Sequence, residues 1–156
     1  MNKDDSSSKQ RLRLWIQLLR TTRSTESELR EFLRLEHDTT LPRFDVMAAL
    51  YRAPNGLTMT ELSRYLLVSN GNVTTVVDRL VQDGMAIREQ QANDRRSLRV
   101  SLTEQGQQQF TVMAKAHEAK VNALFADFNS EEIEQLLNLL KAHAHKESPH
   151  DEPGLA

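Results

Sequence analysis

The spacing of apolar residues changes twice along this chain of 156 residues, and these changes restrict the possible fold more than any other feature. From residue 9 to residue 81, apolar side chains recur every three or four residues, as they do along one face of an α-helix. After Gly84 they alternate with polar residues, which is the period of a β-strand, and after Thr103 the helical spacing returns. The sequence therefore predicts a mainly α-helical fold that contains one small β-hairpin.

Breaks and caps divide the N-terminal helical part into separate helices. The first helix is predicted over residues 9–36, and it ends before Leu41-Pro42 because proline disfavours the helical conformation in the residue that precedes it. A second helix follows Pro42. Thr58 and Glu61 then have the spacing of a capping box, so Thr58 is expected to be the N-cap of a short third helix.

Residues 69–84 allow two interpretations. Asn70-Gly71 is typical of a tight turn between two β-strands. Five apolar residues after it have the spacing of one helix face instead: Val73, Val76, Val77, Leu80 and Val81. Ser69 and Gly84 are residue types that commonly cap the two ends of a helix. We therefore predict a helix between them rather than a hairpin.

A two-stranded β-hairpin is predicted after Gly84. Its alternating apolar residues are Met85 and Ile87 before a polar tip, and Leu98, Val100 and Leu102 after that tip. The last four arginines of the chain fall in this stretch: Arg88, Arg95, Arg96 and Arg99. They are expected at the end of the hairpin and along one face of it.

The C-terminal part is predicted to form two helices. In the first, from Thr103, one row of residues steps alternately by four and three: Phe110, Ala114, His117, Val121, Leu124 and Phe128. A heptad-like row of this kind is expected to pack against a partner helix. The second helix starts after a break at residues 129–132. Residues 1–8 and 147–156 are expected to be flexible tails.

Composition excludes several classes of protein. The chain has no cysteine, which excludes disulfides, thiolate metal sites and a cysteine nucleophile. Its five glycines lack the spacing of a phosphate-binding loop, so most nucleotide-dependent enzymes are excluded as well. No apolar run approaches the roughly 20 residues that a membrane-spanning helix needs, and no secretory signal is visible, so a cytoplasmic protein without membrane contact is expected.

The distribution of charge favours a nucleic-acid partner. The net charge is only −2, but all 14 arginines precede residue 100. The planar guanidinium group of arginine binds phosphates and base edges better than the point charge of lysine does. A solvated surface is the alternative explanation for such a charge distribution.

The helix predicted between Ser69 and Gly84 has an outer face of hydrogen-bonding side chains: Asn70, Asn72, Thr74, Thr75, Asp78 and Arg79. Short side chains such as Asn and Thr let a helix approach the base edges in the major groove of DNA. A polar face that only meets solvent is the alternative. The tight turn before this helix and the arginine-tipped hairpin after it favour a winged helix-turn-helix.

Three segments of the chain resemble the multiple antibiotic resistance regulator (MarR) family of bacterial transcription factors: LPRFDVMAALYRAP, LTMTELSRYLLVSNGNVTTVVDRLVQDG and NDRRSLRVSLTEQG. The most specific match is Asp94-x-Arg96 followed by Leu102-Thr103-x-x-Gly106. The resemblance implies a homodimer that binds a palindromic operator in double-stranded DNA. It also implies that a small aromatic or phenolic compound often releases the protein from DNA.

The resemblance also implies that separate segments of the chain form the dimerisation region and the DNA-binding domain. Residues 9–36 and 103–146 would form a helical dimerisation region, and residues 42–102 would form the winged helix-turn-helix. The implied DNA contacts on the recognition helix and its start are Ser69, Asn70, Asn72, Thr74, Thr75 and Arg79. One of these positions departs from the family, because many members have arginine where this chain has Thr75.

In the wing, the resemblance assigns separate roles to three neighbouring residues. Arg96 would enter the minor groove, where narrow A·T tracts concentrate negative potential. Asp94 would hold the guanidinium of Arg96 in place, and Arg95 would meet a phosphate.

The effector that the family favours is an aromatic carboxylate, such as a hydroxycinnamate product, or its coenzyme A thioester. A cluster of four residues near the first two helices could host it: Trp15, His37, Arg43 and Phe44. His117 is expected to be a packed interface histidine rather than a ligand contact. The C-terminal histidines include His143, His145 and His150, but they have no carboxylate at fixed helical spacing, so we expect no metal site and no cofactor.

Taken together, the residues and the resemblance predict a dimeric DNA-binding repressor that is not an enzyme. Two alternatives remain, an architectural or activating DNA-binding protein without an effector, and a helical module that binds another protein. Salt separates the last of these, since binding that depends on phosphate contacts weakens steeply as salt rises.

Overall fold

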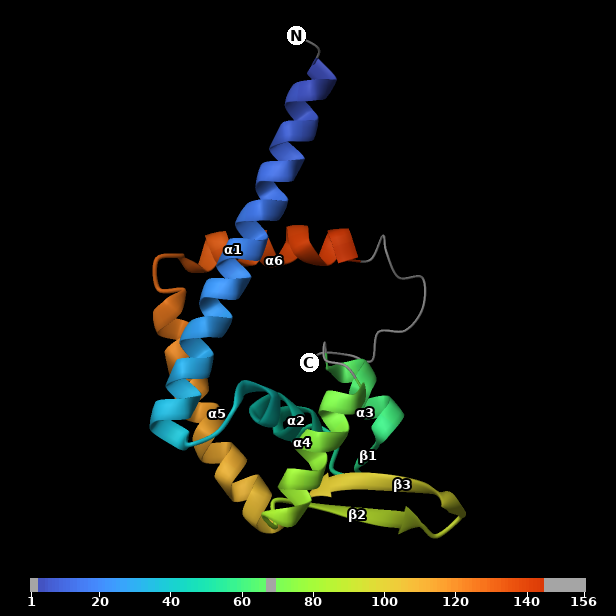
Figure 1. Cartoon of the computed structure of the whole chain (residues 1–156). Helices are drawn as coiled ribbons and strands as arrows, with labels where there is room; N and C mark the ends of the chain where they lie inside the picture. The colour runs from blue at the N-terminus through green and yellow to red at the C-terminus, as the bar shows by residue number, and fades with distance from the viewer. Residues whose placement is uncertain (1–2, 67–69, 145–156) are drawn as a thin grey trace. The chain divides into compact units, whose positions relative to one another are not determined.

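The computed structural model describes residues 3–66 and 70–144 (Figure 1). The elements are α1 (Lys3–His37), α2 (Leu41–Tyr51), β1 (Leu57–Thr58), α3 (Met59–Tyr65), α4 (Asn70–Gln82), β2 (Ala86–Gln91), β3 (Asp94–Leu102), α5 (Glu104–Leu124) and α6 (Ser130–Ala144). The chain divides into two compact units, residues 1–121 and 122–156. The prediction of a mainly α-helical fold with a small antiparallel sheet is confirmed.

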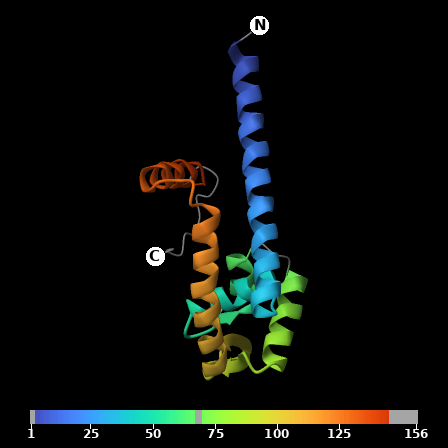
Figure 2. The ribbon, with the colours of Figure 1, turned by 90° about the vertical axis from the view of Figure 1, so that its left-hand side faces the viewer.

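Helix α1 begins earlier than predicted. It includes residues 3–8, which the sequence analysis assigns to a flexible tail. Near its C-terminal end α1 buries Leu29 and Leu33, whereas its N-terminal half extends away from the other helices of the first unit (Figures 1 and 2).

The next two helices both have N-terminal caps, of which the sequence analysis predicts only the one at α3. Thr40 precedes α2 and its hydroxyl accepts a hydrogen bond from the backbone N–H of Arg43 at 3.3 Å. Thr58 and Glu61 form the predicted capping box at the start of α3, with the backbone N–H of each donating to the side chain of the other at 2.8 and 3.2 Å. These caps satisfy N–H groups that have no partner inside the helix.

Residues 70–82 form helix α4, which confirms the prediction of a helix rather than a hairpin. Val73, Val77 and Leu80 are fully buried on its inner face. Gly84 ends the helix as predicted. It has a φ of 74°, and the backbone N–H groups of Gly84 and Met85 bond back to the carbonyls of Val81 and Leu80 at 3.1 and 2.8 Å.

The sheet has three strands rather than the two that were predicted, in the order β1-β3-β2. The short strand β1 places Leu57 opposite Val100 and Thr58 opposite Arg99. Gly56 makes this pairing possible. Its φ of 76° suits glycine, and a Cβ built there would lie 2.7 Å from the carbonyl oxygen of Val100.

The register of β2 and β3 corrects the predicted faces of the hairpin. Ala86 lies opposite Leu102, and both are buried, whereas Ile87 is 38% exposed. Arg88 lies opposite Val100 and Arg99 lies opposite Glu89, so the two arginines belong to opposite faces because side chains alternate along a strand. The sequence analysis expected the arginines to line one face of the hairpin, and this expectation is wrong for Arg88 and Arg99.

The row of residues along α5 is partly covered within the same chain. The ring of Phe110 lies 5.4 Å from that of Phe44 and 4.9 Å from that of Tyr51, and the His117 ring stacks on Phe44 at 4.3 Å. At these positions the helix that the row packs against is α2 of the same chain, which supplies the partner rings.

The second unit contains the end of α5 and helix α6. Asn129 and Glu132 form a capping box at the start of α6, with backbone-to-side-chain bonds of 2.9 and 3.0 Å. The apolar residues of α6 are exposed: Ile133, Leu136, Leu137, Leu139 and Leu140.

Candidate nucleic-acid interface

Helix α4 presents a polar face opposite its buried valines. The side chains on this face are exposed: Asn72, Thr74, Thr75, Asp78 and Arg79. Ser69 and the side chain of Asn70, which were predicted to belong to the same face, lie outside the part of the chain that the structure describes. The face has donors and acceptors within a few atoms of the backbone, as close approach to base edges requires.

The hairpin β2–β3 follows α4 directly, and Ala92 and Asn93 connect its two strands. Asp94 is exposed at the start of β3. The side chains of Arg95 and Arg96 are outside the described residues, although their backbone is part of β3. The roles predicted for these two arginines stay predictions.

An ion pair joins the hairpin to α4. A guanidinium nitrogen of Arg88 in β2 lies 2.5 Å from a carboxylate oxygen of Asp78 in α4. The sequence analysis places Asp78 on the outer face of α4, but it does not give it a partner. The pair compensates a negative charge that would otherwise repel phosphates, and it restrains the hairpin relative to α4.

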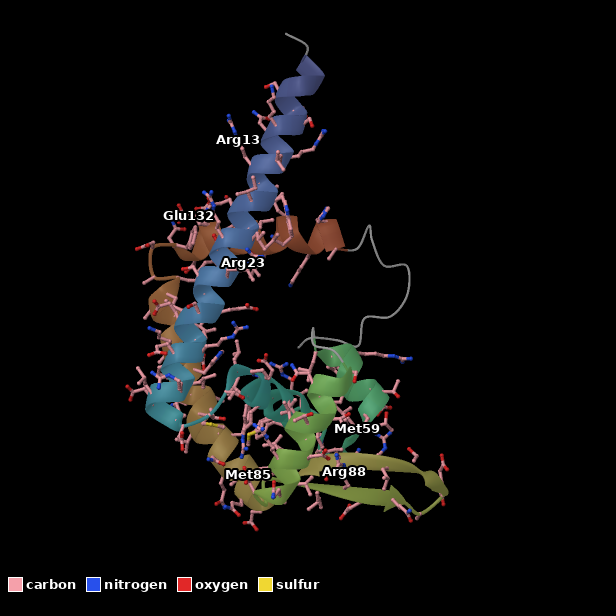
Figure 3. All side chains as sticks on the ribbon, in the orientation of Figure 1. Arg13, Arg23, Met59, Met85, Arg88 and Glu132 are labelled. Atoms are coloured by element: carbon pink, nitrogen blue, oxygen red, sulfur yellow. The ribbon has the colours of Figure 1, made fainter. Side chains whose placement is uncertain are left out.

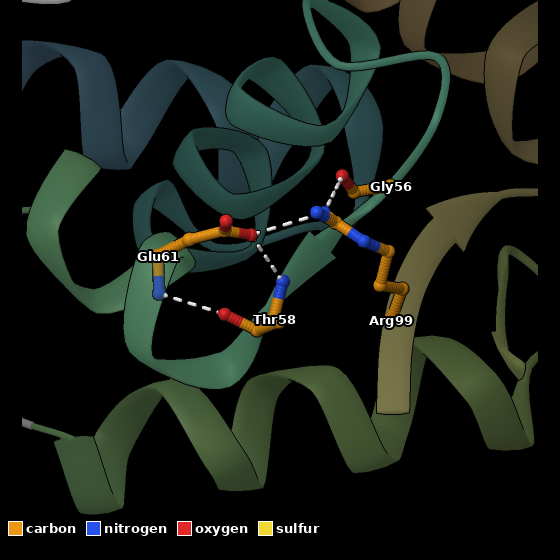
Figure 4. A network of polar contacts seen from close by, with 4 residues as sticks. All are labelled: Gly56, Thr58, Glu61 and Arg99. Carbon is orange, nitrogen blue, oxygen red and sulfur yellow. Dashed lines mark hydrogen bonds and ion pairs between the residues drawn. The ribbon is translucent and has the colours of Figure 1, made fainter. Parts of the chain in front are cut away.

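Arg99 belongs to a second internal network (Figure 4). Its Nη1 atom donates to the carbonyl oxygen of Gly56 at 2.8 Å and to Oε2 of Glu61 at 3.0 Å. The same Oε2 accepts the backbone N–H of Thr58 at 2.8 Å. The hydrogen bond from Thr58 and the positive charge of Arg99 hold the pKa of Glu61 below its ordinary value. This network ties β3 to the start of α3.

Thr103 joins the end of α4 to the start of α5. Its hydroxyl donates to the carbonyl oxygen of Gly84 at 2.7 Å and accepts the backbone N–H of Gly106 at 3.0 Å. Its own N–H donates to the carbonyl oxygen of Met85 at 3.0 Å. Gly106 lies so close to the Met85 carbonyl that any side chain at this position would collide with it. The pattern Thr103-x-x-Gly106 therefore has a structural reason.

Comparison with known proteins shows which family this chain resembles. A model of the MarR family matches residues 37–97. An HTH-type transcriptional regulator of Bacillus subtilis, YkoM, is 37% identical over 107 residues, which are 68% of each chain. The chain belongs to the MarR family. It is thus a DNA-binding transcriptional regulator and not an enzyme.

Solved structures of the MarR family have the same fold. A variant of MarR from Escherichia coli, solved in complex with operator DNA, is 26% identical, with a TM-score of 0.75 and coverage of 85% of this chain and 94% of that one. BpsR from Bordetella bronchiseptica is 20% identical, with a TM-score of 0.74 and coverage of 85% and 98%. Its structure concerns regulation of DNA binding by 6-hydroxynicotinic acid.

The four residues predicted to host an effector do not form one cluster. Trp15 and His37 lie on the same helix, and their 22-residue separation corresponds to about 33 Å along the axis. Trp15 is 57% exposed, and the ring of His37 meets that of Phe32 at 5.4 Å. The prediction of a single cluster within one chain is wrong, because α1 is continuous over residues 3–37.

The other two residues of that set already have partners in the same chain. Nη1 of Arg43 lies 2.6 Å from Oδ2 of Asp83, and Phe44 stacks on His117. Burial lowers the pKa of the His117 imidazole, which favours its neutral form in the stack. Arg43 is therefore an interhelical contact, and Phe44 is part of the packing between α2 and α5.

Two further observations concern the described residues only. No three histidine, aspartate or glutamate side chains among them come close enough to bind a metal ion, and His145 and His150 are not part of that set. None of the helices there combines the length and the apolar character that crossing a bilayer requires.

Proposed function

We propose that this MarR family member is a repressor that binds a palindromic operator as a homodimer. In this proposal α4 lies in the major groove, the tip of the β2–β3 hairpin reaches the adjacent minor groove, and an aromatic acid or its coenzyme A thioester releases the complex. The observation that carries the proposal is the exposed polar face of α4, to which the Asp78–Arg88 ion pair anchors the wing.

The residue types on α4 indicate how the two kinds of DNA contact are divided. Asn72 has the geometry to donate to and accept from one adenine edge, and Thr74 and Thr75 can contact base edges or the thymine methyl group. Arg79 makes no ion pair with the other described residues, and its guanidinium suits a phosphate. Ser69 and Asn70 are proposed to contact DNA at the start of the same helix. In the wing, we assign Arg96 to the minor groove and Arg95 to a phosphate.

The dimerisation region is proposed to consist of residues 9–36 and 103–146, with residues 42–102 forming the DNA-binding domain. Exposed apolar side chains on the N-terminal half of α1 and along α6 support this assignment: Leu12, Leu14, Trp15, Leu136, Leu137 and Leu140. The two surfaces also carry opposite charge. Arg13 and Arg23 lie on α1, and Glu132 lies in the first turn of α6 (Figure 3).

An effector that weakens DNA binding must prefer a conformation that binds DNA poorly, since equal affinity for both conformations shifts nothing. Coupling of this kind is typically about 1–3 kcal/mol and is reciprocal. Operator DNA should therefore lower the affinity for an aromatic acid such as 4-hydroxycinnamate by the same factor. Calorimetry that finds the same affinity with and without DNA would refute regulation by that acid.

Fluorescence anisotropy with two duplexes tests the assignment of α4. One duplex is selected by the wild-type protein from a random-sequence pool, and the other has the same composition in scrambled order. Asn72→Ala is expected to weaken the free energy of binding to the selected duplex by about 1–3 kcal/mol and to change binding to the scrambled duplex little. Arg79→Ala is expected to weaken both duplexes and to reduce the salt dependence of binding.

Gln109→Ala on α5 is the matched control, because Gln109 is exposed and is not among the proposed DNA contacts. If Asn72→Ala and Gln109→Ala behave alike on both duplexes, α4 does not read bases and the proposal fails. Binding that does not depend on salt would favour a protein partner instead.

A further inference from the structure

The C-terminal turn of the recognition helix α4 is held from two sides. Asp83, directly after α4, accepts a charged hydrogen bond from Arg43 of α2, with 2.6 Å between Nη1 and Oδ2. Gly84 and Met85, the next two residues, are bonded to Thr103 at the start of α5. Three consecutive residues thus connect α4 to both α2 and α5.

Both members of the Arg43–Asp83 pair occupy positions that their own helices disfavour. Arg43 is in the first turn of α2, near the partial positive charge of its N-terminus. Asp83 continues the last turn of α4, where its N–H bonds to the carbonyl of Arg79, near the partial negative charge of the C-terminus. Helix electrostatics therefore do not account for either charge, and the contact between the two residues does.

The two side chains of the pair differ in their exposure to solvent, and Arg43 is the more buried one. The side chain of Arg43 is 22% exposed and that of Asp83 is 50% exposed. An ion pair with this exposure contributes little to the free energy of unfolding. Its main physical effect is to fix the distance between the start of α2 and the end of α4.

A restraint at Asp83 acts on the whole of α4. The turn after the helix is closed by the two backbone bonds of Gly84 and Met85 and by the hydroxyl of Thr103, so it cannot swivel freely. Asn72 lies 11 residues before Asp83, which corresponds to about 17 Å along the helix axis. Over this length, a small rotation at Asp83 displaces the base-facing side chains by an appreciable fraction of a hydrogen-bond length.

We propose that Arg43 is a positioning residue for the recognition helix, and that it sets the orientation of α4 through Asp83 without touching DNA. This role rests on the proposed function of α4 as the base-reading element. It predicts that loss of the pair impairs discrimination between DNA sequences more than it impairs stability or general attraction to DNA.

The test compares Arg43→Gln, Asp83→Asn and the exchanged pair Arg43→Asp with Asp83→Arg in the full-length chain. The exchanged pair is compatible with both helices, since it places an acid at an N-terminus and a base at a C-terminus. Arg34→Gln is the matched control, because it removes the same charge and another ion pair, with Glu31 on α1, far along the sequence from α4. Affinity is measured at one salt concentration on the selected and scrambled duplexes, together with the thermal midpoint.

Arg43→Gln and Asp83→Asn are each expected to bind the selected duplex roughly tenfold more weakly, near the lower end of the loss from one mismatched base pair. Their affinity for the scrambled duplex should change no more than that of Arg34→Gln, with thermal midpoints close to that of the wild type. The exchanged pair should recover most of the lost discrimination.

Equal losses on both duplexes, or an exchanged pair as poor as Arg43→Gln, would overturn the positioning role. A large fall in the thermal midpoint of both single variants would overturn it as well, because the residues would then be structural. If the wild-type protein itself selects no duplex, the proposed function fails, and the role of Arg43 fails with it.

Discussion

The environment of His117 predicts how the stability of the protein depends on pH. Its ring stacks on Phe44 at 4.3 Å, and burial holds its pKa below the ordinary value. The unfolded chain therefore binds more protons than the folded chain just below pH ~6.5, so stability rises with pH through that window. We expect the free energy of unfolding to fall as the pH is lowered from about 7.5 to about 5.5.

His117→Phe should remove part of this pH dependence while it retains a ring against Phe44. Urea unfolding of both proteins at several pH values gives the free energy of unfolding as a function of pH. Comparing the two pH dependences cancels the contribution of groups that titrate in the same way in both proteins. The same pH dependence of the free energy of unfolding in both proteins would mean that His117 is as easily protonated in the folded protein as in the unfolded one.

Asp94 allows a test in which two physical effects have opposite signs. As an anion near phosphates it would repel DNA, and as the partner of Arg96 it would reduce the cost of ordering a long side chain. We expect Arg96→Ala to lower operator affinity by about 1–3 kcal/mol. Asp94→Ala should also weaken binding, since repulsion is screened over ~8–10 Å and a hydrogen bond acts at contact.

A double-mutant cycle at fixed salt separates these effects. With Arg96 already replaced, Asp94→Ala should no longer weaken binding and should slightly strengthen it. The same loss in both backgrounds would instead assign Asp94 to the conformation of the loop.

At the scale of elements, the contact between α5 and the turn after α4 predicts whether replacing Gly106 raises or lowers stability. Helix propensity alone would favour Gly106→Ala by about 1 kcal/mol. A Cβ at Gly106 would collide with the Met85 carbonyl, however, so we expect the variant to lose about 1–3 kcal/mol of stability. Chemical denaturation measures this change.

Gly84→Ala is the control for a glycine with space around it. The nearest atom to a Cβ built at Gly84 is 3.7 Å away, so the cost there arises from its φ of 74° alone, about 1–2 kcal/mol. A Gly106→Ala protein more stable than the wild type would show that α5 can move away from Met85, and that the contact is not a fixed one.

Local spacing was sufficient to predict several elements. The capping box of Thr58 and Glu61, the helix over residues 70–82 and its glycine cap depend on residues within a few positions of one another. The third strand, the Asp78–Arg88 pair and the Arg99 network could not be predicted in this way, because pairing across the fold leaves no periodic signal.

The candidate site was predicted to a similar extent. The polar face of α4 follows from the helical period, and its side chains at positions 72, 74, 75, 78 and 79 are exposed as that period requires. Charge counting could not separate arginines that bind inside the protein from those available to DNA. Arg88 and Arg99 have internal carboxylate partners from α4 and α3, and only tertiary structure identifies them.

At the scale of the whole molecule, dimerisation through the terminal helices is the first consequence to test. Leu137 and Leu140 on α6 are 50% and 48% exposed, and burial of each leucine contributes roughly 1.5–3 kcal/mol. Because a symmetric dimer contains each substitution twice, Leu137→Lys with Leu140→Lys should weaken dimerisation by at least about 100-fold.

Sedimentation equilibrium at micromolar concentration measures this effect. Leu98→Lys is the control, since Leu98 is 47% exposed but lies in the hairpin, and it should leave the dimer intact. A wild-type chain that sediments as a stable monomer would contradict the proposed dimer.

The most direct test of the central claim is selection of duplexes from a random-sequence pool by the wild-type protein, followed by binding measurements over a range of salt. A homodimer that inserts two α4 helices into DNA should enrich an inverted repeat with half-site centres about 10 base pairs apart. Its affinity for that repeat should fall steeply as salt rises. Enrichment of no sequence, of a single half-site, or of a repeat whose binding is insensitive to salt would contradict the account.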